Sequence, residues 1–308
     1  MSIEADAGAA SGSRDVAVAG APHSRPYLWS LKRELWENRS VWMAPLAAAG
    51  FVLFGFAISL MRSPHTLKAI SKMTPEKLAG IRFAPFGISA GGLILSTIVV
   101  GIFYCLGTLY NERRDRSILF WKSMPVSDLT TLLAKITIPL VVLPVIAFFV
   151  ICATQLLMFG LDLAVLASRG GAFAQLWSTV PLLHIWALLL YLLAALALWH
   201  APIYAYLLAL SASVRKGPLL WAVLPPIALA IFEKLAFDTN YVSRVLHERF
   251  FGSFEAAFSG GFGHKPMFRF PDPDPARFFA TPGLWIGLVL AVALFAFAVW
   301  MRRRREPM

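Results

Sequence analysis

The sequence predicts an all-α integral membrane protein with six transmembrane helices, an amphipathic helix before the first span and a large outer loop before the last. Of its 308 residues, 58% are hydrophobic and 15% are charged, whereas soluble domains average about 45–50% and about 25%. The apolar residues form runs that match the roughly 20 residues a helix needs to cross the hydrocarbon core. Chain length alone would suggest one or two soluble domains, but these runs leave little chain to form one.

Six apolar runs define the predicted spans, which cover approximately 42–61, 86–110, 129–159, 180–210, 219–237 and 282–301. The third and fourth runs exceed one bilayer thickness, so these helices are expected to tilt, kink or extend past the membrane. Pro139, Pro144 and Pro202 are the expected kink points, and the pair Pro225 and Pro226 interrupts the fifth run.

The regions outside the spans set the predicted orientation. Residues 1–26 are rich in Ala, Gly and Ser and lack the basic-then-apolar order of a secretory signal, so they are predicted to be a disordered cytoplasmic tail. The six-helix domain covers 27–301, and a basic cytoplasmic tail covers 302–308. Lys and Arg are roughly twice as dense in the connections assigned to the inside, although 62–85 on the other side is also basic. Both termini are therefore expected in the cytoplasm, with the chain in a cytoplasmic membrane of bacterial type.

The net charge of +11 fits either nucleic acid or an anionic membrane surface as a partner. The basic residues flank apolar runs and end in the cluster Arg302 to Arg305, which favours lipid headgroups. No nucleic-acid partner is therefore expected. Cys105 and Cys152 lie inside apolar runs and are predicted to be core residues without a disulfide.

Residues 27–41 predict a helix lying in the membrane interface. At about 100° per residue, its apolar side gathers five residues: Leu28, Trp29, Leu31, Leu35 and Trp36. Arg33, Glu34 and Glu37 fall on the opposite side. Lys32 and Arg39 lie within the apolar arc and would extend their charges toward the headgroups. Such a helix either transmits movement or serves as an inert anchor.

The connection 110–132 between the second and third spans combines charge with apolar surface. Its first part is suited to a helix with a pairing of Glu112 and Arg116 at i,i+4, and Ile118, Leu119 and Trp121 then offer apolar contacts. Pro125 ends that helix, while Ser127 can cap a new one. The predicted site residues here are Glu112, Arg113, Arg114, Asp115, Arg116, Pro125, Ser127 and Asp128. An ordinary charged loop is the alternative.

The outer loop covers 238–281, where Phe250, Phe254 and Phe258 recur at the spacing of a helix at the outer interface. The Pro-rich stretch 271–275 predicts an extended connector. This loop either caps the helices or controls the exit of a substrate.

Polar residues at membrane depth are the candidates for a translocation path, because such groups usually face protein or water. Gln155 and His200 are the candidates for the path, although His200 can equally be satisfied near the Pro202 kink. Glu233 and Lys234 are expected to reach the outer interface. No metal ligand set and no nucleophile with a placed base is recognisable, so no metal site and no catalytic residue is predicted.

The run from Glu112 and Arg113 to Ser117, then Ser123 to Ser127 and Lys135, resembles the cytoplasmic-loop signature of ABC-2 type transporter permeases. In that family a Glu-Arg pair precedes a small residue, an apolar stretch, a Pro-Val-Ser turn and a Lys at the start of the third helix. The order of parts along the chain is also similar. Ser117 departs from the pattern, since Gly is common at that position.

The resemblance implies the permease subunit of an ATP-driven exporter, with a second permease subunit and separate ATP-binding subunits as partners. It implies that the loop 110–132 docks on the ATPase, with Glu112, Arg113, Pro125 and Ser127 as parts of it. The chain has no phosphate-binding Gly-x-x-x-x-Gly-Lys-Ser/Thr loop, so ATP and Mg²⁺ are expected on the partner and this chain is not expected to be an enzyme. An ion-coupled secondary transporter and a non-transporting anchor or sensor are the alternatives.

Overall fold

The computed structural model describes residues 26–62, 75–115, 126–168, 181–259 and 272–304. It is built from helices, six of which are long and apolar enough to cross a membrane. They are α2 (Ser40–Arg62), α4 (Pro75–Arg114), the continuous α6 (Asp128–Thr137), η2 (Ile138–Val142) and α7 (Leu143–Ala167), then α9 (Leu182–Ser213), α10 (Pro218–Phe237) and α13 (Pro282–Arg304). The predicted all-α fold with six long apolar helices is confirmed.

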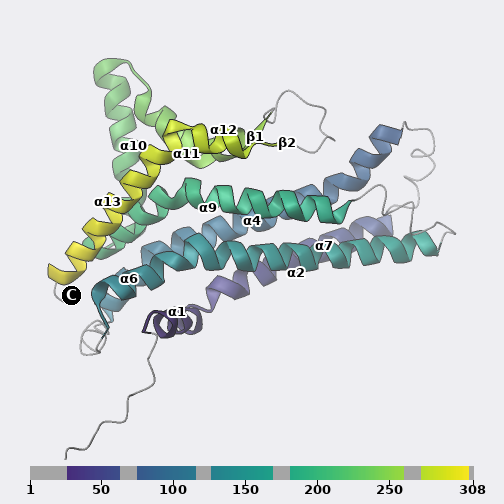
Figure 1. Ribbon diagram of the computed structural model, residues 1–308, viewed down its shortest axis with the longest axis horizontal. Coiled ribbons are helices and arrows are strands. Elements are labelled where there is room, and N and C mark those ends of the chain that lie inside the picture. The colour runs from purple at the N-terminus through teal and green to yellow at the C-terminus, as the bar shows by residue number, and fades with distance from the viewer. Residues whose placement is uncertain (1–25, 63–74, 116–125, 169–180, 260–271, 305–308) are drawn as a thin grey trace, which may run out of the picture.

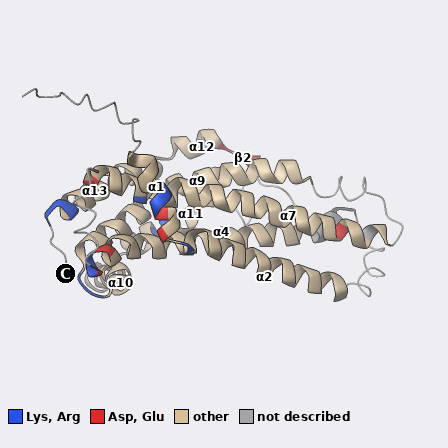
Figure 2. Ribbon diagram, turned by 90° about the horizontal axis from the view of Figure 1, so that it is seen from below, with Lys and Arg blue, Asp and Glu red and all other residues tan. Residues whose placement is uncertain are grey.

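Helix α1 (Pro26–Glu37) lies across the long axis of the bundle at one end. It is seen end on in Figure 1, whereas its length is visible in the turned view of Figure 2. The chain turns between Glu37 and Ser40, where α2 begins. This is the orientation expected of a helix in a membrane interface beside a bundle that crosses the bilayer.

Three of the long helices exceed the thickness of a bilayer. Helix α4 has 40 residues, which corresponds to about 60 Å, or roughly twice the hydrocarbon thickness. At the end of the molecule opposite α1, α4 and α7 reach farther than α9 (Figure 1). The third and fourth spans were predicted to exceed one bilayer thickness, and the lengths of the continuous α6–α7 helix and of α9 agree with this. The length of α4 was not predicted.

Where the third span was predicted to kink, the helix changes to a short π-helical segment. Pro139 lies at its beginning, and Pro144 follows in the first turn of α7. Each proline lacks the N–H that an α-helix would use, and a π-bulge accommodates the altered register. Helices α9 and α10 instead run without a break past Pro202 and past Pro225 and Pro226.

Helices α9 and α13 pack closely because small residues line their contact. Ala201 and Ala205 of α9 meet Ala291 of α13, and nearer the charged end Ala209 meets Ala298. Small side chains at a spacing of about one turn allow two helix backbones to approach in a membrane.

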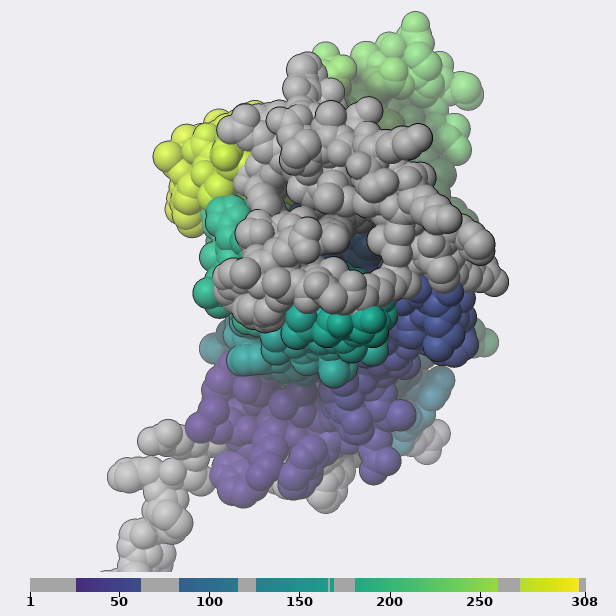
Figure 3. Space-filling model, turned by 90° about the vertical axis from the view of Figure 1, so that its right-hand side faces the viewer, coloured from purple at the N-terminus to yellow at the C-terminus, as the bar shows by residue number. Residues whose placement is uncertain are grey.

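Helix α10 projects away from the other long helices. Figures 1 and 2 show it crossing the long axis, and Figure 3 shows the green end of this region on the side opposite the purple N-terminal helices. Its ends carry the two left-handed residues of the described chain, Gly217 (φ 63°) and Asp238 (φ 51°). Gly217 tolerates this conformation without steric cost. Glu233 is the buried residue of α10, and most of the helix's apolar surface is exposed, apart from a partly buried stripe at Pro218, Ala222, Pro226 and Ala230.

The segment between α10 and α13, which we call the outer segment after its predicted position, contains α11 (Tyr241–Ala257), strands β1 (Phe258–Ser259) and β2 (Asp272–Pro273), and α12 (Pro275–Ala280). The strands pair antiparallel, with Phe258 opposite Pro273. The predicted helix is present, but it ends before Phe258, whose ring stacks on Phe254 at 4.7 Å. The extended connector is present at Asp272 and Pro273.

Trp199 of α9 anchors this segment to the bundle. Its indole N–H donates to the carbonyl of Glu248 at 3.0 Å, and the Arg249 guanidinium lies 5.0 Å from its ring. Arg249 also donates to the carbonyl of Gly283 at the start of α13. The aromatic ring and the cation therefore join α9, α11 and α13.

Candidate functional site: a buried cluster of charges

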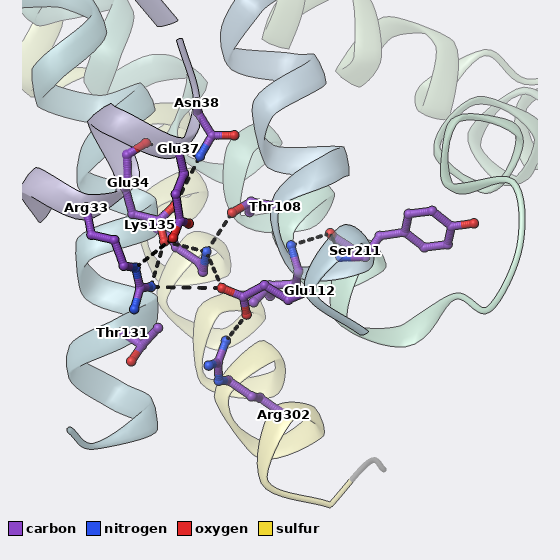
Figure 4. A network of polar contacts seen from close by, with 12 residues as sticks. Arg33, Glu34, Glu37, Asn38, Thr108, Glu112, Thr131, Lys135, Ser211 and Arg302 are labelled. Carbon is purple, nitrogen blue, oxygen red and sulfur yellow. Dashed lines mark hydrogen bonds and ion pairs between the residues drawn. The ribbon is translucent and has the colours of Figure 1, made fainter. Parts of the chain in front are cut away.

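Charged residues of four helices lie near α1 at one end of the bundle (Figure 2), and Figure 4 shows their side chains in contact. The charge cluster, as we define it, consists of Arg33, Glu34, Glu112, Asp128, Lys135 and Arg302. Its formal charges balance. Because α1 and the end of α13 both contribute, the two ends of the helical domain lie at the same end of the bundle.

Lys135 of α6 lies at the centre. Its Nζ is 2.6 Å from Glu34 Oε1 of α1 and 2.9 Å from Glu112 Oε1 of α4. It also donates to the hydroxyl of Thr108 at 2.8 Å. Of the three N–H donors of the ammonium, two hydrogen-bond to Glu34 and Thr108, and the Glu112 carboxylate adds an ion pair, although only 2% of the side chain is exposed. Two carboxylates and a hydroxyl therefore offset the burial of this charge.

Arg302 connects the last helix to the same cluster. Its Nη1 lies 2.8 Å from Glu112 Oε2, and its Nε lies 2.9 Å from Asp128 Oδ1. Glu112 thus contacts Lys135 through one carboxylate oxygen and Arg302 through the other. A displacement of Glu112 would disturb α6 and α13 together.

Glu34 lies on the side of α1 that faces the protein interior. Tyr104 of α4 donates to Glu34 Oε2 at 2.9 Å, and Arg33 lies 3.0 Å from Oε1. Burial acts to raise the pKa of Glu34, but the neighbouring Lys135 and Arg33 outweigh it and hold the pKa below its ordinary value. Glu34 is therefore ionised at neutral pH.

Arg113 ties the end of α4 to the end of α9. Its Nη2 donates to the carbonyls of Ser211 and Val214, each at 2.7 Å. The Ser211 hydroxyl in turn accepts from the backbone N–H groups of Leu109 and Tyr110. The last carbonyls of a helix lack intrahelical partners, so Arg113 satisfies the end of α9.

The predicted start of the helix after Pro125 is confirmed. Ser127 has an extended backbone and its hydroxyl accepts from the N–H of Thr130 at 3.1 Å. Asp128 in the first turn faces the positive end of the helix dipole and also binds Arg302. From this cap the helix continues without a break through η2 into α7.

The predicted loop residues divide into distinct groups. Glu112 and Arg113 are buried at 8% and 4% exposure, so their contacts are internal to this chain. Arg114 and Asp115 are exposed and pair with each other at 3.0 Å. Arg116 and Pro125, and with them the expected pairing of Glu112 with Arg116, lie outside the described residues.

The five apolar residues predicted for one side of α1 differ in burial. Leu31 and Leu35 pack against the core around Tyr104 and Ile138. The other three, Leu28, Trp29 and Trp36, are exposed. Glu34 lies on the polar side in the helical projection but is 1% exposed, because Lys135 faces it.

Sequence reasoning did not identify the roles of Glu34, Tyr104, Thr108 and Arg302. The signal that could have found them is a set of single charges of opposite sign near the same end of several apolar helices. Arg302 in particular was assigned to a basic tail, whereas it is 4% exposed.

The candidate path residues occupy different surroundings. Gln155 is fully buried, and its amide donates to the carbonyl of Phe86 and accepts from the indole of Trp186. His200 lies at a cavity of about 20 Å³ between α4, the π-helix, α7 and α9, room for about one water molecule. Its Nδ1 is 2.9 Å from the carbonyl of Leu196.

No family model, curated protein or solved structure matches this chain.

Proposed function

We propose that this chain is the permease subunit of an ATP-driven exporter of the ABC-2 type. It would pair with a separate ATP-binding subunit and a second permease subunit in a bacterial-type cytoplasmic membrane. Two observations support the proposal: the loop signature from Glu112 to Lys135, and the charge cluster that surrounds both ends of this loop.

The contact between Glu112 and Lys135 carries the proposal. Glu112 lies at the beginning of the loop 110–132 and Lys135 lies just after its end, and their charged atoms are 2.9 Å apart. Glu34 of α1 and Arg302 of α13 bind the same pair. A push on the loop from an ATPase would therefore reach α1, α4, α6 and α13 through one set of ion pairs, and ATP and Mg²⁺ would remain on the partner.

The exposed apolar surface of α10 supports the expectation of a second permease subunit. It is formed by Leu219, Leu220, Trp221, Val223, Leu224, Ile227, Leu229, Ile231, Phe232, Leu235 and Phe237. Helix–helix contacts in a bilayer come from close van der Waals packing. A homologous or identical subunit could cover part of this surface, and lipid would cover the rest.

The test separates docking from coupling in the complex purified with its ATPase. Arg114→Ala with Asp115→Ala removes exposed loop charges, so we expect less ATPase to be co-purified. Glu112→Gln keeps the surface and should retain the ATPase, but ATP should no longer change the accessibility of a cysteine placed at Phe279 in the outer segment. A complex in which Glu112→Gln responds to ATP as the wild type does would contradict the coupling role.

One observation favours the second candidate, an ion-coupled transporter, because His200 lies beside a small cavity within the spans. Ionisable groups at this depth serve proton and ion pathways in such proteins. Gradient-driven transport by the purified chain, without ATP or a partner, would support this candidate against the exporter.

A further inference from the structure

The outward face of α1 carries a cation between two aromatic rings. The Lys32 ammonium lies 5.6 Å from the ring centroid of Trp29 and 4.9 Å from that of Trp36. The two rings are 64% and 69% exposed. Leu28 extends the same face by one helical turn. We call these four residues, Leu28, Trp29, Lys32 and Trp36, the outward face of α1.

The ammonium of Lys32 has hydrogen-bond capacity left over. Among the described residues it contacts the two rings and no carboxylate or carbonyl. Ring faces attract a cation but do not replace the strong acceptors that three N–H donors can take. A phosphate is the acceptor that suits such a group at a membrane surface.

The negative charges of α1 point elsewhere. Glu34 is buried against Lys135, and Glu37 lies 3.6 Å from Arg33 on the side of the charge cluster. Lys32 is consequently the charge of the outward face, which is positive and flanked by indoles. This pattern is complementary to an anionic headgroup and to the apolar region just below it.

We propose that the outward face of α1 binds the headgroup of an anionic phospholipid. The Lys32 ammonium contacts the phosphate, the indole rings of Trp29 and Trp36 lie at the depth of the glycerol and headgroup, and Leu28 contacts the acyl chains. The inference goes beyond the proposed transport function, because it requires neither ATP nor a partner subunit.

The position of this face links the lipid to the charge cluster. Lys32 and Glu34 lie within one turn of α1, so a lipid held by Lys32 binds the same helix turn that Glu34 attaches to Lys135. Bound lipid is therefore expected to stabilise the folded chain, as any ligand of the native state does.

The test measures lipid binding by the purified full chain. Titration of detergent-solubilised protein with phosphatidylglycerol, followed by the increase in unfolding temperature, gives an apparent affinity, and phosphatidylcholine is titrated alongside. Lys32→Gln is expected to weaken the phosphatidylglycerol affinity about five-fold, the change that about 1 kcal/mol per basic residue corresponds to. Lys32→Arg keeps the charge and should retain most of the affinity.

The matched control is Lys216→Gln, an exposed lysine between α9 and α10 at the same end of the bundle, which should bind as the wild type does. Unfolding temperatures without lipid check that each variant is folded. Unchanged phosphatidylglycerol affinity in Lys32→Gln, or an equal loss in Lys216→Gln, would overturn the proposal. An equal stabilisation by inorganic phosphate would also overturn it, because it would show that the headgroup anion needs no lipid.

Discussion

At the scale of single residues, Lys135 illustrates what a buried ion pair contributes. It fixes the relative positions of the helices that carry the charges rather than adding net stability. Two carboxylates and a hydroxyl compensate its desolvation. Replacing such a group by apolar residues is often neutral, whereas removing one partner leaves uncompensated buried charge. The geometry therefore fixes how α1, α4 and α6 meet.

Lys135→Met is expected to destabilise the folded chain by about 3–5 kcal/mol, because Glu34 and Glu112 lose their shared cation. The measurement is chemical or thermal unfolding in detergent, with Lys216→Met as the exposed control. Combining Lys135→Met with Glu34→Gln should cost less than the sum of the two single changes, by roughly 0.5–3 kcal/mol. Strict additivity would show that the two groups do not interact.

The lowered pKa of Glu34 also predicts that the stability of the folded chain depends on pH. Its folded pKa lies below the ordinary value of 4.5, so it contributes stability that is fully present above pH 4.5 and is lost as the pH falls through the folded pKa. The unfolding temperature should fall on acidification below pH 4.5. Glu34→Gln should show a smaller loss over the same range, and equal slopes for both proteins would contradict this account.

At the scale of elements, the contact between α11 and α13 depends on a glycine. A Cβ at Gly287 would lie 2.5 Å from Arg249 Nη1, closer than side-chain atoms approach. Gly287→Ala is therefore expected to destabilise the chain by about 1–3 kcal/mol. Gly55→Ala in α2 is the matched control, since a Cβ there meets nothing within 4 Å.

The combination of Gly287→Ala with Arg249→Ala tests the cause of that loss. Removing the guanidinium makes space for the new methyl group, so Gly287→Ala should cost less in the Arg249→Ala background. The measurement is again the unfolding temperature. An unchanged cost would place the strain in a neighbour other than Arg249.

The apolar runs predicted where the six long helices lie, because hydrophobic length and the Ser127 cap are local properties. They missed the first eleven residues of α4, which begins at Pro75, and the last eight of α7, which ends at Ala167. Which charged side chains pair with one another is not a local property. Glu112 and Arg302 are 190 positions apart in sequence, and periodicity gives no indication of which charges share one depth. The projection of α10 also escaped prediction, since a helix that is apolar all round carries no preferred face.

At the scale of the whole molecule, α13 joins the charge cluster to the outer segment. Arg302 lies in the charge cluster, and Gly283 accepts a hydrogen bond from Arg249 at the outer segment. Trp199 of α9 holds the same outer contact. Helix α13 is therefore a continuous connection between the charge cluster and the outer segment.

The proposed orientation is tested by labelling with a membrane-impermeant maleimide. Arg114→Cys, next to the charge cluster, should react in inside-out vesicles, and Leu183→Cys at the opposite end should react in intact cells. Both substitutions are made in a chain with Cys105 and Cys152 replaced by Ala. Reaction of Arg114→Cys from outside would place the loop beyond the reach of a cytoplasmic ATPase.

Helix α4 carries Glu112 at one end and runs about 60 Å without interruption to Pro75. A rigid arm of that length magnifies rotation: each degree of tilt about the inner end moves the far tip by about 1 Å. A tilt of a few degrees at the Glu112 end would thus move the Pro75 end of α4 by several ångströms while the turns of the helix stay intact.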